Sequence, residues 1–291
     1  MAKNKQLVEN LVHGLFLLLG LITVGCVLLI TVYLVVSGIP AIREIGLVNF
    51  LFGRRWASTA AEPAYGILPF ILTSIYGTAG AILIGVPAGF LCAVYLAKMA
   101  QPGIRNIIEA AVSLLAGIPS VVYGLVGMIV LVPAIRELFG LSSGACLLAA
   151  IIVLAIMILP SIINVAETSL RAVPKEYEEA SLALGATPVE TYFKVSLTAA
   201  RSGIAAGIVL GIGRAVGEAM AVMMVAGNVA NMPSLFQSVR FLTTAVASEM
   251  SYSSPGSLQR NALFSIALVL FLFIMLLNAA LNFFLKRDKE K

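Results

Sequence analysis

The chain has 291 residues, of which 60% are hydrophobic and only 11% are charged, and its mean hydropathy is +1.03. A composition this apolar excludes a soluble globular domain of that length and indicates an integral membrane protein with several spans. The net charge of +5 does not indicate a nucleic-acid partner, because the basic residues are scattered between apolar runs and form no stripe.

Six apolar segments follow one another along the chain, and each is long enough to cross a bilayer as an α-helix. They cover residues 11–36, 66–97, 107–132, 145–165, 203–226 and 262–285. The first run is too long for a signal peptide and lacks a small-residue cleavage site, so we expect it to be retained as a span. The predicted fold class is therefore an all-α integral membrane protein with six transmembrane helices.

Lysine and arginine predict the orientation of these spans. With an inner amino terminus, twelve of the nineteen basic residues lie in inner segments and six in outer segments. The bias predicts that both termini are cytoplasmic. The third outer segment is polar enough to stay outside, but we expect its residues Phe241 to Met250 to form a short helix that dips back into the mouth of the bundle.

The fifth apolar segment carries two charges, Arg214 and Glu218. At about 100° per residue both charges share one stripe of the predicted helix with Gly203, Gly207 and Gly211. Because a charge that faces lipid is expensive and glycines let another helix approach closely, we expect this stripe to face a helix bundle or a water-filled cavity. Glu218 is then one turn from Arg214 and can pair with it. The alternative to a transport role is an ion pair that only fixes helix packing.

The third apolar segment contains a proline, Pro119, which removes a backbone donor and predicts a broken helix at membrane depth. Broken helices are tolerated where they line protein or water, and they often mark a binding site. Ser120 and Tyr123 then present hydroxyls inward as candidate substrate contacts. A plain proline kink with ordinary packing is the alternative.

Charged residues also mark the membrane surfaces. The first outer segment contains Arg54, Arg55 and the only tryptophan, Trp56, which are expected either to dock a partner protein or to anchor the chain at headgroup level. On the inner side, Glu167 at the end of the fourth segment is expected to be a solvated boundary residue.

The longest inner loop predicts a short helix. Pro174 suits its first position, acidic residues that include Glu176, Glu178 and Glu179 favour its amino-terminal end, and Gly185 suits its end. The later residues, such as Ala180, are small or apolar. A groove on a soluble partner explains this composition, and an amphipathic surface helix is the alternative.

The same loop resembles a known signature. The strings E-A-S-L-A-L-G at 179–185 and V-S-L-T at 195–198 are similar to the E-A-A-x-x-x-G-x9-I-x-L-P motif of permease subunits of binding-protein-dependent ABC importers. Ser181 replaces the second alanine, Val195 the isoleucine and Thr198 the final proline. The glycine and the spacing are those of the motif.

Four further strings extend the resemblance over residues 65 to 250. They are Y-G-I-L-P-F-I at 65–71, I-P-S-V-V-Y-G at 118–124, I-M-I-L-P at 156–160 and G-I-G-R-A-V-G-E-A-M-A-V at 211–222. Together they resemble the PstC-type permease of phosphate-specific importers. The resemblance implies a type I importer permease fold, also called MetI-like, with residues 1–65 as first helix and outer loop and residues 66–291 as the core, whose coupling helix lies at about 174–186.

The resemblance also implies a complex in the inner membrane of a prokaryote. Its other parts are a PstA-type second permease, a PstB-type ATPase dimer in the cytoplasm and a PstS-type phosphate-binding protein outside. The chain itself has no phosphate-binding loop, so ATP and Mg²⁺ are expected on the ATPase and no cofactor or catalytic residue on this chain. Arg214, Glu218, Ser120 and Tyr123 would contact the substrate. Residues of the inner loop, Glu178, Glu179, Ala180 and Gly185, would contact the ATPase.

Three alternatives stay open. The same architecture can import molybdate, sulfate or an amino acid, and a permease-shaped protein can act as a membrane sensor or scaffold without transport. An intramembrane enzyme is disfavoured, because the single histidine, His13, lies at a membrane edge and no serine has a plausible base beside it. The three cysteines have no metal-ligand spacing, and no metal site is predicted.

Overall fold

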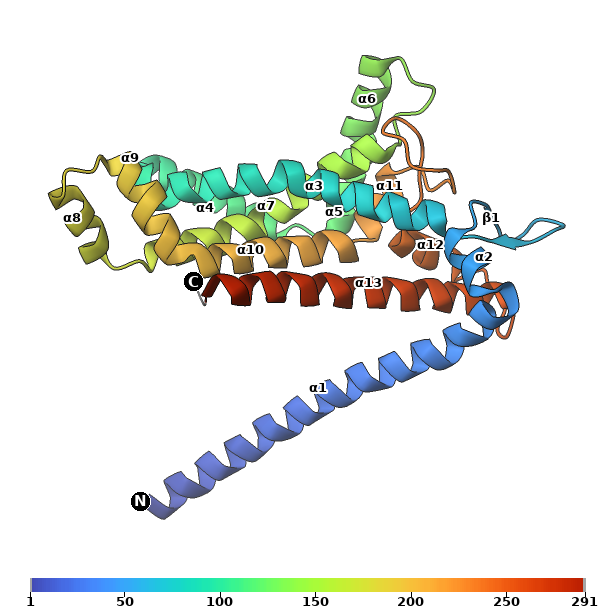
Figure 1. The fold of residues 1–291 in the computed structure, drawn as a ribbon, viewed down its shortest axis with the longest axis horizontal. Coiled ribbons are helices and arrows are strands. Elements are labelled where there is room, and N and C mark those ends of the chain that lie inside the picture. The colour runs from blue at the N-terminus through green and yellow to red at the C-terminus, as the bar shows by residue number, and fades with distance from the viewer. Residues whose placement is uncertain (1, 290–291) are drawn as a thin grey trace.

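The computed structural model describes residues 2–289, and most of them lie in helices that run along one axis (Figure 1). Among these residues, six stretches are long and apolar enough to cross a membrane: Leu11–Ile45, Leu68–Met99, Ser120–Phe139, Leu147–Arg171, Pro188–Gly217 and Leu258–Ala280. The predicted all-α class with six spans is confirmed. The bounds of the third and fifth spans differ from the prediction, because both helices are interrupted.

The first half of the chain forms α1 (Ala2–Ile45), α2 (Leu47–Phe52), β1 (Trp56–Ala57), β2 (Ala64–Tyr65), α3 (Leu68–Val94), the π-helical turn η1 (Tyr95–Met99), α4 (Pro102–Gly117), α5 (Ser120–Val126), the π-helical turn η2 (Gly127–Leu131) and α6 (Val132–Phe139). The second half forms α7 (Leu147–Arg171), α8 (Lys175–Ala183), α9 (Pro188–Glu190), the π-helical turn η3 (Thr191–Ser196), α10 (Leu197–Gly217), α11 (Met220–Val225), α12 (Leu242–Glu249) and α13 (Leu258–Lys289). The two short strands pair antiparallel, with Trp56 opposite Tyr65.

Helix α7 is the centre of the bundle. It is the most buried of the spans and packs against α3, α10 and α4. Its side chains form the main apolar core together with those of α11. A helix that is apolar on all sides is expected to be surrounded by other helices, and the composition of α7 fits that position.

Glycines bring α10 and α3 close to α7. A Cβ atom at Gly207 would lie 3.0 Å from Cβ of Val165, and one at Gly211 would lie 2.9 Å from Cγ1 of Ile162. On α3, a Cβ atom at Gly85 would lie 2.6 Å from Cδ1 of Ile158. The glycines predicted to admit a neighbouring helix do so, and the neighbour is α7.

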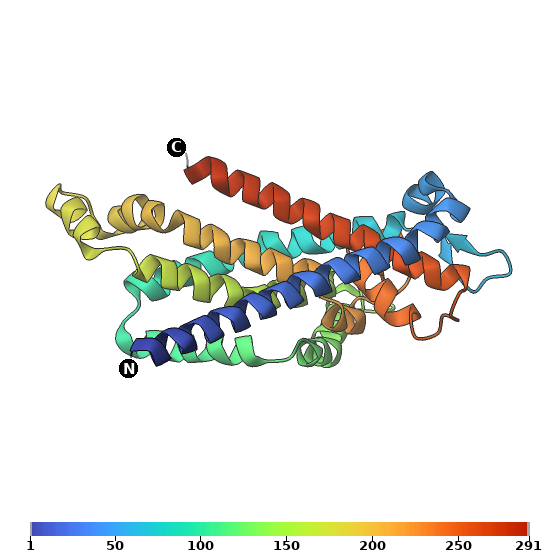
Figure 2. The same cartoon turned by 90° about the horizontal axis from the view of Figure 1, so that it is seen from below.

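Helix α1 stands apart from the bundle. Towards the carboxyl end of α1 the ring of Tyr33 packs edge-on against Phe264 of α13, with ring centroids 5.3 Å apart, and the Ser265 hydroxyl donates to the Gly38 carbonyl at 2.6 Å. Towards its amino terminus α1 diverges from α13 (Figure 1), and its apolar stretch is exposed. The amino-terminal end of α1 and the carboxyl-terminal end of α13 lie towards the end of the molecule that carries α8 (Figure 2).

We predict that Gly207→Leu destabilises the chain by roughly 1 to 3 kcal/mol, because the added side chain overpacks the α7–α10 contact. Gly213→Ala is the matched control on the same helix, since a Cβ atom there meets nothing within 4 Å. The measurement is thermal unfolding of the purified protein in detergent. Equal midpoints for the two variants would contradict the packing described here.

Candidate functional site

Two helix breaks form the candidate site. Helix α4 ends at Gly117, and the next two residues, Ile118 and Pro119, are extended with ψ of 126° and 144° before α5 begins. Helix α10 ends at Gly217, Glu218 is extended with ψ of 130°, and α11 begins at Met220. The third predicted span is therefore two helices, α4 and α5, followed by α6, which turns away from the long axis (Figure 1).

The two breaks lie against each other because α5 packs on α11. A Cβ atom at Gly124 would lie 2.8 Å from the Ala221 Cα atom, and one at Gly127 would lie 2.8 Å from Cγ1 of Val225. The contact therefore requires glycine on α5. It places the start of both short helices at one depth in the bundle.

The first break is stabilised by Tyr123. An unbroken helix would have the N–H of residue 119 donate to the Leu115 carbonyl, but Pro119 has no N–H. The Tyr123 hydroxyl donates to that carbonyl at 2.7 Å. Tyr123 therefore supplies the donor that the proline lacks, whereas its predicted role was to present its hydroxyl to a substrate.

The second break is stabilised by Glu218 itself. Its Oε1 accepts a hydrogen bond from the Ala221 N–H at 3.0 Å, which satisfies an amide at the start of α11, and its backbone carbonyl accepts from the Thr243 hydroxyl at 2.8 Å. Thr243 belongs to α12, the short outer helix that the sequence predicts at 241–250. Helix α12 is thus tied directly to the break.

Arg214 lies in the last turn of α10 and is half-buried. Its side chain forms no hydrogen bond or ion pair with any residue between 2 and 289, although its charge acts on the nearby Tyr123 hydroxyl. The predicted pair with Glu218 is not formed. The prediction assumed a continuous helix, and the end of α10 at Gly217 removes Glu218 from the helical period.

Ser120, the first residue of α5, is partly exposed. Within the described part of the chain its hydroxyl makes no hydrogen bond. Of the four residues predicted to contact a substrate, Arg214, Ser120 and Glu218 therefore keep unpaired polar atoms near the breaks. Their contact with a substrate stays a prediction.

An apolar cavity of about 430 Å³ lies behind Tyr123, between α4, α5, η2 and α7. Its lining is almost entirely aliphatic, with residues such as Ile118, Val126 and Ile156. A charged solute would lose its hydration there without gaining partners. The cavity is therefore no binding site for an ion.

The predicted helix of the long loop is present as α8, with Pro174 at its N-cap and Gly185 at a φ of 88° just after its end. The Glu178 carboxylate forms an ion pair with Lys98 and accepts from the Ser196 hydroxyl at 2.7 Å. Glu178 therefore anchors α8 to η1, which follows α3, and to η3, which precedes α10. This anchor was missed, since the sequence does not show which inner lysine lies nearby.

The other residues predicted to contact an ATPase, Glu179, Ala180 and Gly185, are exposed. Leu184 beside them is 89% exposed, and Tyr177 is 56% exposed. This apolar surface of α8 is unusual for a segment outside the membrane and is available to a partner.

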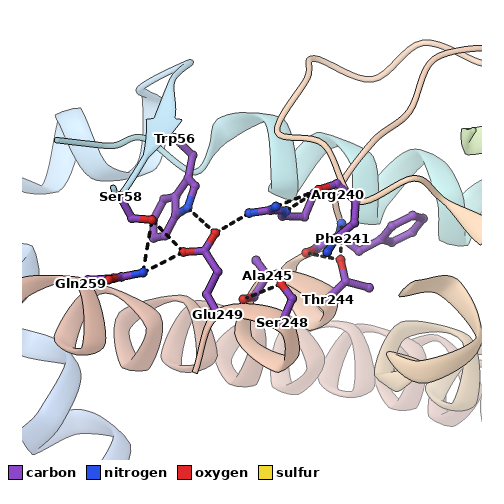
Figure 3. A network of polar contacts seen from close by, with 10 residues as sticks. Trp56, Ser58, Arg240, Phe241, Thr244, Ala245, Ser248, Glu249 and Gln259 are labelled. Atoms are coloured by element: carbon purple, nitrogen blue, oxygen red, sulfur yellow. Dashed lines mark hydrogen bonds and ion pairs between the residues drawn. The ribbon is translucent and has the colours of Figure 1, made fainter. Parts of the chain in front are cut away.

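At the end of the molecule opposite α8, a polar network surrounds Glu249 (Figure 1 and Figure 3). Its carboxylate accepts from the Trp56 indole at 2.9 Å, from the Ser58 hydroxyl at 2.9 Å and from the Gln259 amide at 3.2 Å, and it pairs with Arg240. Trp56 is 7% exposed and belongs to this network. The predicted cluster is divided, because Arg54 and Arg55 are exposed while Trp56 is buried.

The burial of Glu167 differs from the prediction. The residue was expected to be solvated, but it is 7% exposed and pairs with Arg171 one turn later on α7. The spacing of four residues between opposite charges was a signal for this pair that the sequence reasoning did not use.

Comparisons with known proteins agree with this architecture. Residues 85–288 match the family described as "Binding-protein-dependent transport system inner membrane component". A Bacillus subtilis protein named "Probable ABC transporter permease protein YqgH" is 38% identical over 283 residues, covering 95% of this chain and 92% of the relative. The "Phosphate transport system permease protein PstC" of Haemophilus influenzae is 32% identical, covering 92% of this chain and 90% of the relative.

Two solved structures show the same fold. The inward-facing MetNI methionine ABC transporter aligns with a TM-score of 0.56 at 21% identity, covering 77% of this chain and 94% of that chain. A bacterial alginate ABC transporter, in complex with its pentasaccharide-bound periplasmic protein, aligns with a TM-score of 0.59 at 14% identity, covering 92% of each chain. The predicted MetI-like fold is confirmed.

The anchor of α8 leads to a pH prediction. Burial raises the pKa of Glu178, but the hydrogen bonds from Lys98 and Ser196 outweigh burial and hold the pKa below its usual value. A carboxyl group whose pKa is lower in the folded state contributes stability at every pH above its unfolded pKa of about 4.3. That contribution is lost only as the pH falls below this value. Hydrogen exchange of the α8 amides, corrected for intrinsic rates, should therefore not change between pH 5 and 8.

In Lys98→Met the cation is lost and burial dominates, so the Glu178 pKa should rise above its unfolded value. Protection of α8 should then be greatest at low pH and fall as the pH rises through the new pKa, in contrast to the constant protection of the wild type between about pH 5 and 8. Lys194→Met, which removes a lysine that is 74% exposed, is the control and should keep the wild-type profile. A flat profile in Lys98→Met would refute the anchor.

Proposed function

The chain belongs to the inner membrane components of binding-protein-dependent transport systems, and from that premise we propose that it is the permease subunit of an ATP-driven importer that carries inorganic phosphate into the cytoplasm. The chain is a multi-pass inner membrane protein and a component of a transport system. The phosphate-specific part of the proposal is supported by relatives that are named PstC and by the strings at 118–124 and 211–222.

The observation that carries the proposal is the unpaired Arg214. A guanidinium keeps its charge when it is desolvated and donates two parallel hydrogen bonds, which suits an oxyanion. Intramembrane charges without a partner mark functional sites by default. Arg214 is half-buried beside both breaks, where an anion would meet it together with the Ser120 hydroxyl.

Glu218 has a complementary role in the proposal. One carboxylate oxygen binds the Ala221 amide, which leaves the other free to accept a hydrogen bond from a protonated phosphate oxygen. A fully ionised anion such as sulfate has no such proton and would be repelled. The carboxylate also lowers the affinity of the site for anions, which prevents Arg214 from trapping them.

The proposed complex places each partner on a different surface. The exposed side of α8, with Leu184 and Tyr177, receives the ATPase dimer that holds ATP and Mg²⁺. Arg54 and Arg55 at the outer end contact the phosphate-binding protein. The free length of α1 packs against a PstA-type permease, because its apolar side chains have few neighbours within this chain. Both termini lie on the α8 side, which is cytoplasmic in this arrangement.

Two other functions remain as alternatives. The same architecture can carry molybdate, sulfate or another small solute, and the name of the Bacillus relative specifies no substrate. A membrane sensor or scaffold without transport would also keep the fold. Purification of the chain from its own membranes tests the sensor or scaffold alternative. A purified complex that contains no ATPase would support that alternative.

Uptake by the reconstituted complex tests the substrate. The wild type should take up phosphate in preference to sulfate and molybdate, and Arg214→Gln should lower uptake by about tenfold or more, since a hydrogen bond to a charged group contributes roughly 1.5 to 3 kcal/mol. Glu218→Gln should lower uptake and admit sulfate. The control is Arg136→Gln, an exposed arginine on α6.

Preference of the wild type for another solute would exclude phosphate as the substrate. Wild-type rates in both Arg214→Gln and Glu218→Gln, in complexes that assemble normally, would end the proposed role of these residues.

Copurification tests the ATPase surface. Leu184→Glu should reduce the ATPase retained by the purified permeases by about tenfold or more, because it places a charge in an apolar contact that alone is worth roughly 1.5 to 3 kcal/mol. The control is Leu138→Glu, which is 78% exposed on α6, a helix that projects from the bundle away from α8 (Figure 1). Equal retention in both variants would exclude α8 as the contact.

A further inference from the structure

Four charged residues form an inner cluster that the proposed function does not use. Arg105 and Glu109 lie on α4, and Glu167 and Arg171 lie on α7. The guanidinium of Arg171 contacts both carboxylates, and Nε of Arg105 lies 3.5 Å from Oε1 of Glu109. Two acids and two bases from two helices therefore share one site.

The cluster contains a buried carboxylate, Glu167, whose Oε1 lacks a hydrogen-bond partner. Glu167 is 7% exposed, and its Oε1 contacts Arg171 without an aligned hydrogen bond. Removal of Arg171 would leave the Glu167 and Glu109 carboxylates beside each other without the cation that contacts both. Loss of the cation that contacts both carboxylates would destabilise the buried Glu167. The Arg171–Glu109 pair itself is partly exposed, with side-chain exposures of 39% and 34%, and it joins α4 to α7 beside the apolar cluster that contains Val112 and Ile163.

The cluster lies between the base of α8 and the helix α4 that leads to the Pro119 break. Arg171 is the last residue of α7, and only Ala172 and Val173 separate it from the N-cap of α8. Glu109 lies on α4, which ends at the Ile118–Pro119 break and is joined to α5 by extended backbone and by the hydrogen bond from Tyr123 to the Leu115 carbonyl. A helix that is interrupted at one end can move as a separate body at the other.

We infer that the Arg171–Glu109 ion pair is a latch that makes α4 move with the base of α8, so that displacement of α8 is transmitted to the Pro119 break. Arg171 and Glu109 are positioning residues that contact neither the substrate nor the ATPase. The inference rests on the proposed transport function. It adds a route to the Pro119 break beside the Glu178 anchor, which joins α8 to η1 after α3 and to η3 before α10 but not to α4.

Charge reversal in the complete complex tests the latch. The variants are Glu109→Arg, Arg171→Glu and the double exchange, and the readout is solute taken up per ATP hydrolysed with loaded binding protein. Each single variant should lower this ratio about tenfold, within the range of typical coupling free energies, while ATP hydrolysis continues. The double exchange should restore at least half of the wild-type ratio. Glu137→Arg, an exposed residue on α6, is the control and should not change it.

A residue that only stabilises the fold would lower assembly and leave the ratio unchanged in the complexes that form. Wild-type ratios in both single variants would therefore overturn the latch, and so would failure of the double exchange to recover. The substrate proposal is judged separately, from the wild type alone. If the wild type imports another solute, the ratio is measured with that solute.

A covalent lock provides a second test that does not depend on the charge variants. Cysteines replace Glu109 and Arg171 in a chain whose Cys26, Cys92 and Cys146 are changed to alanine and which still transports. A short reducible bis-thiosulfonate crosslinker then joins the two positions. Uptake within about twofold of the uncrosslinked protein is expected, because the latch stays closed through the cycle. Loss of uptake that a reductant reverses would show that α4 and α7 separate, and would overturn the inference.

Discussion

The structure depends on the rule that backbone polar groups inside a membrane need partners within the protein. Both helix breaks obey it with local substitutes. The Tyr123 hydroxyl donates to the Leu115 carbonyl, beside a longer bond of 3.3 Å from the Ile118 N–H, and the Glu218 carboxylate accepts from an amide at the start of α11. Because these substitutes exist, the chain can be extended at two points in its core and can place polar atoms there.

The remaining elements hold the breaks in place. Helix α7 provides an apolar axis on which α3, α4 and α10 pack. At the end opposite α8, Glu249 of α12 binds Trp56 in the segment between α2 and α3, and Thr243 of α12 binds the backbone of Glu218. At the other end, Glu178 joins α8 to η1 and η3. Polar contacts are thus concentrated at the two surfaces and at the breaks, and apolar packing occupies the space between.

Errors in the sequence-based predictions have a common origin. Arg214 and Glu218 were placed on one face because the segment was treated as one helix, and nothing in its apolar pattern indicates that α10 ends at Gly217. Trp56 was treated as exposed because its partner, Glu249, is 193 residues away along the chain. Glu167 was treated as solvated, although it is buried beside Arg171. Each error concerns a partner or a break that local periodicity does not report.

The sequence by itself determined the membrane class, the six spans, the short helix that became α8 and the break at Pro119. These features follow from composition, length and local chemistry, which are properties of neighbouring residues. The tertiary structure alone decided that α10 ends before Glu218, that Tyr123 stabilises a backbone carbonyl, and that Arg171 joins α4 to α7. Such features depend on contacts between distant segments, and their partners are selected by packing around α7 rather than by position in the chain.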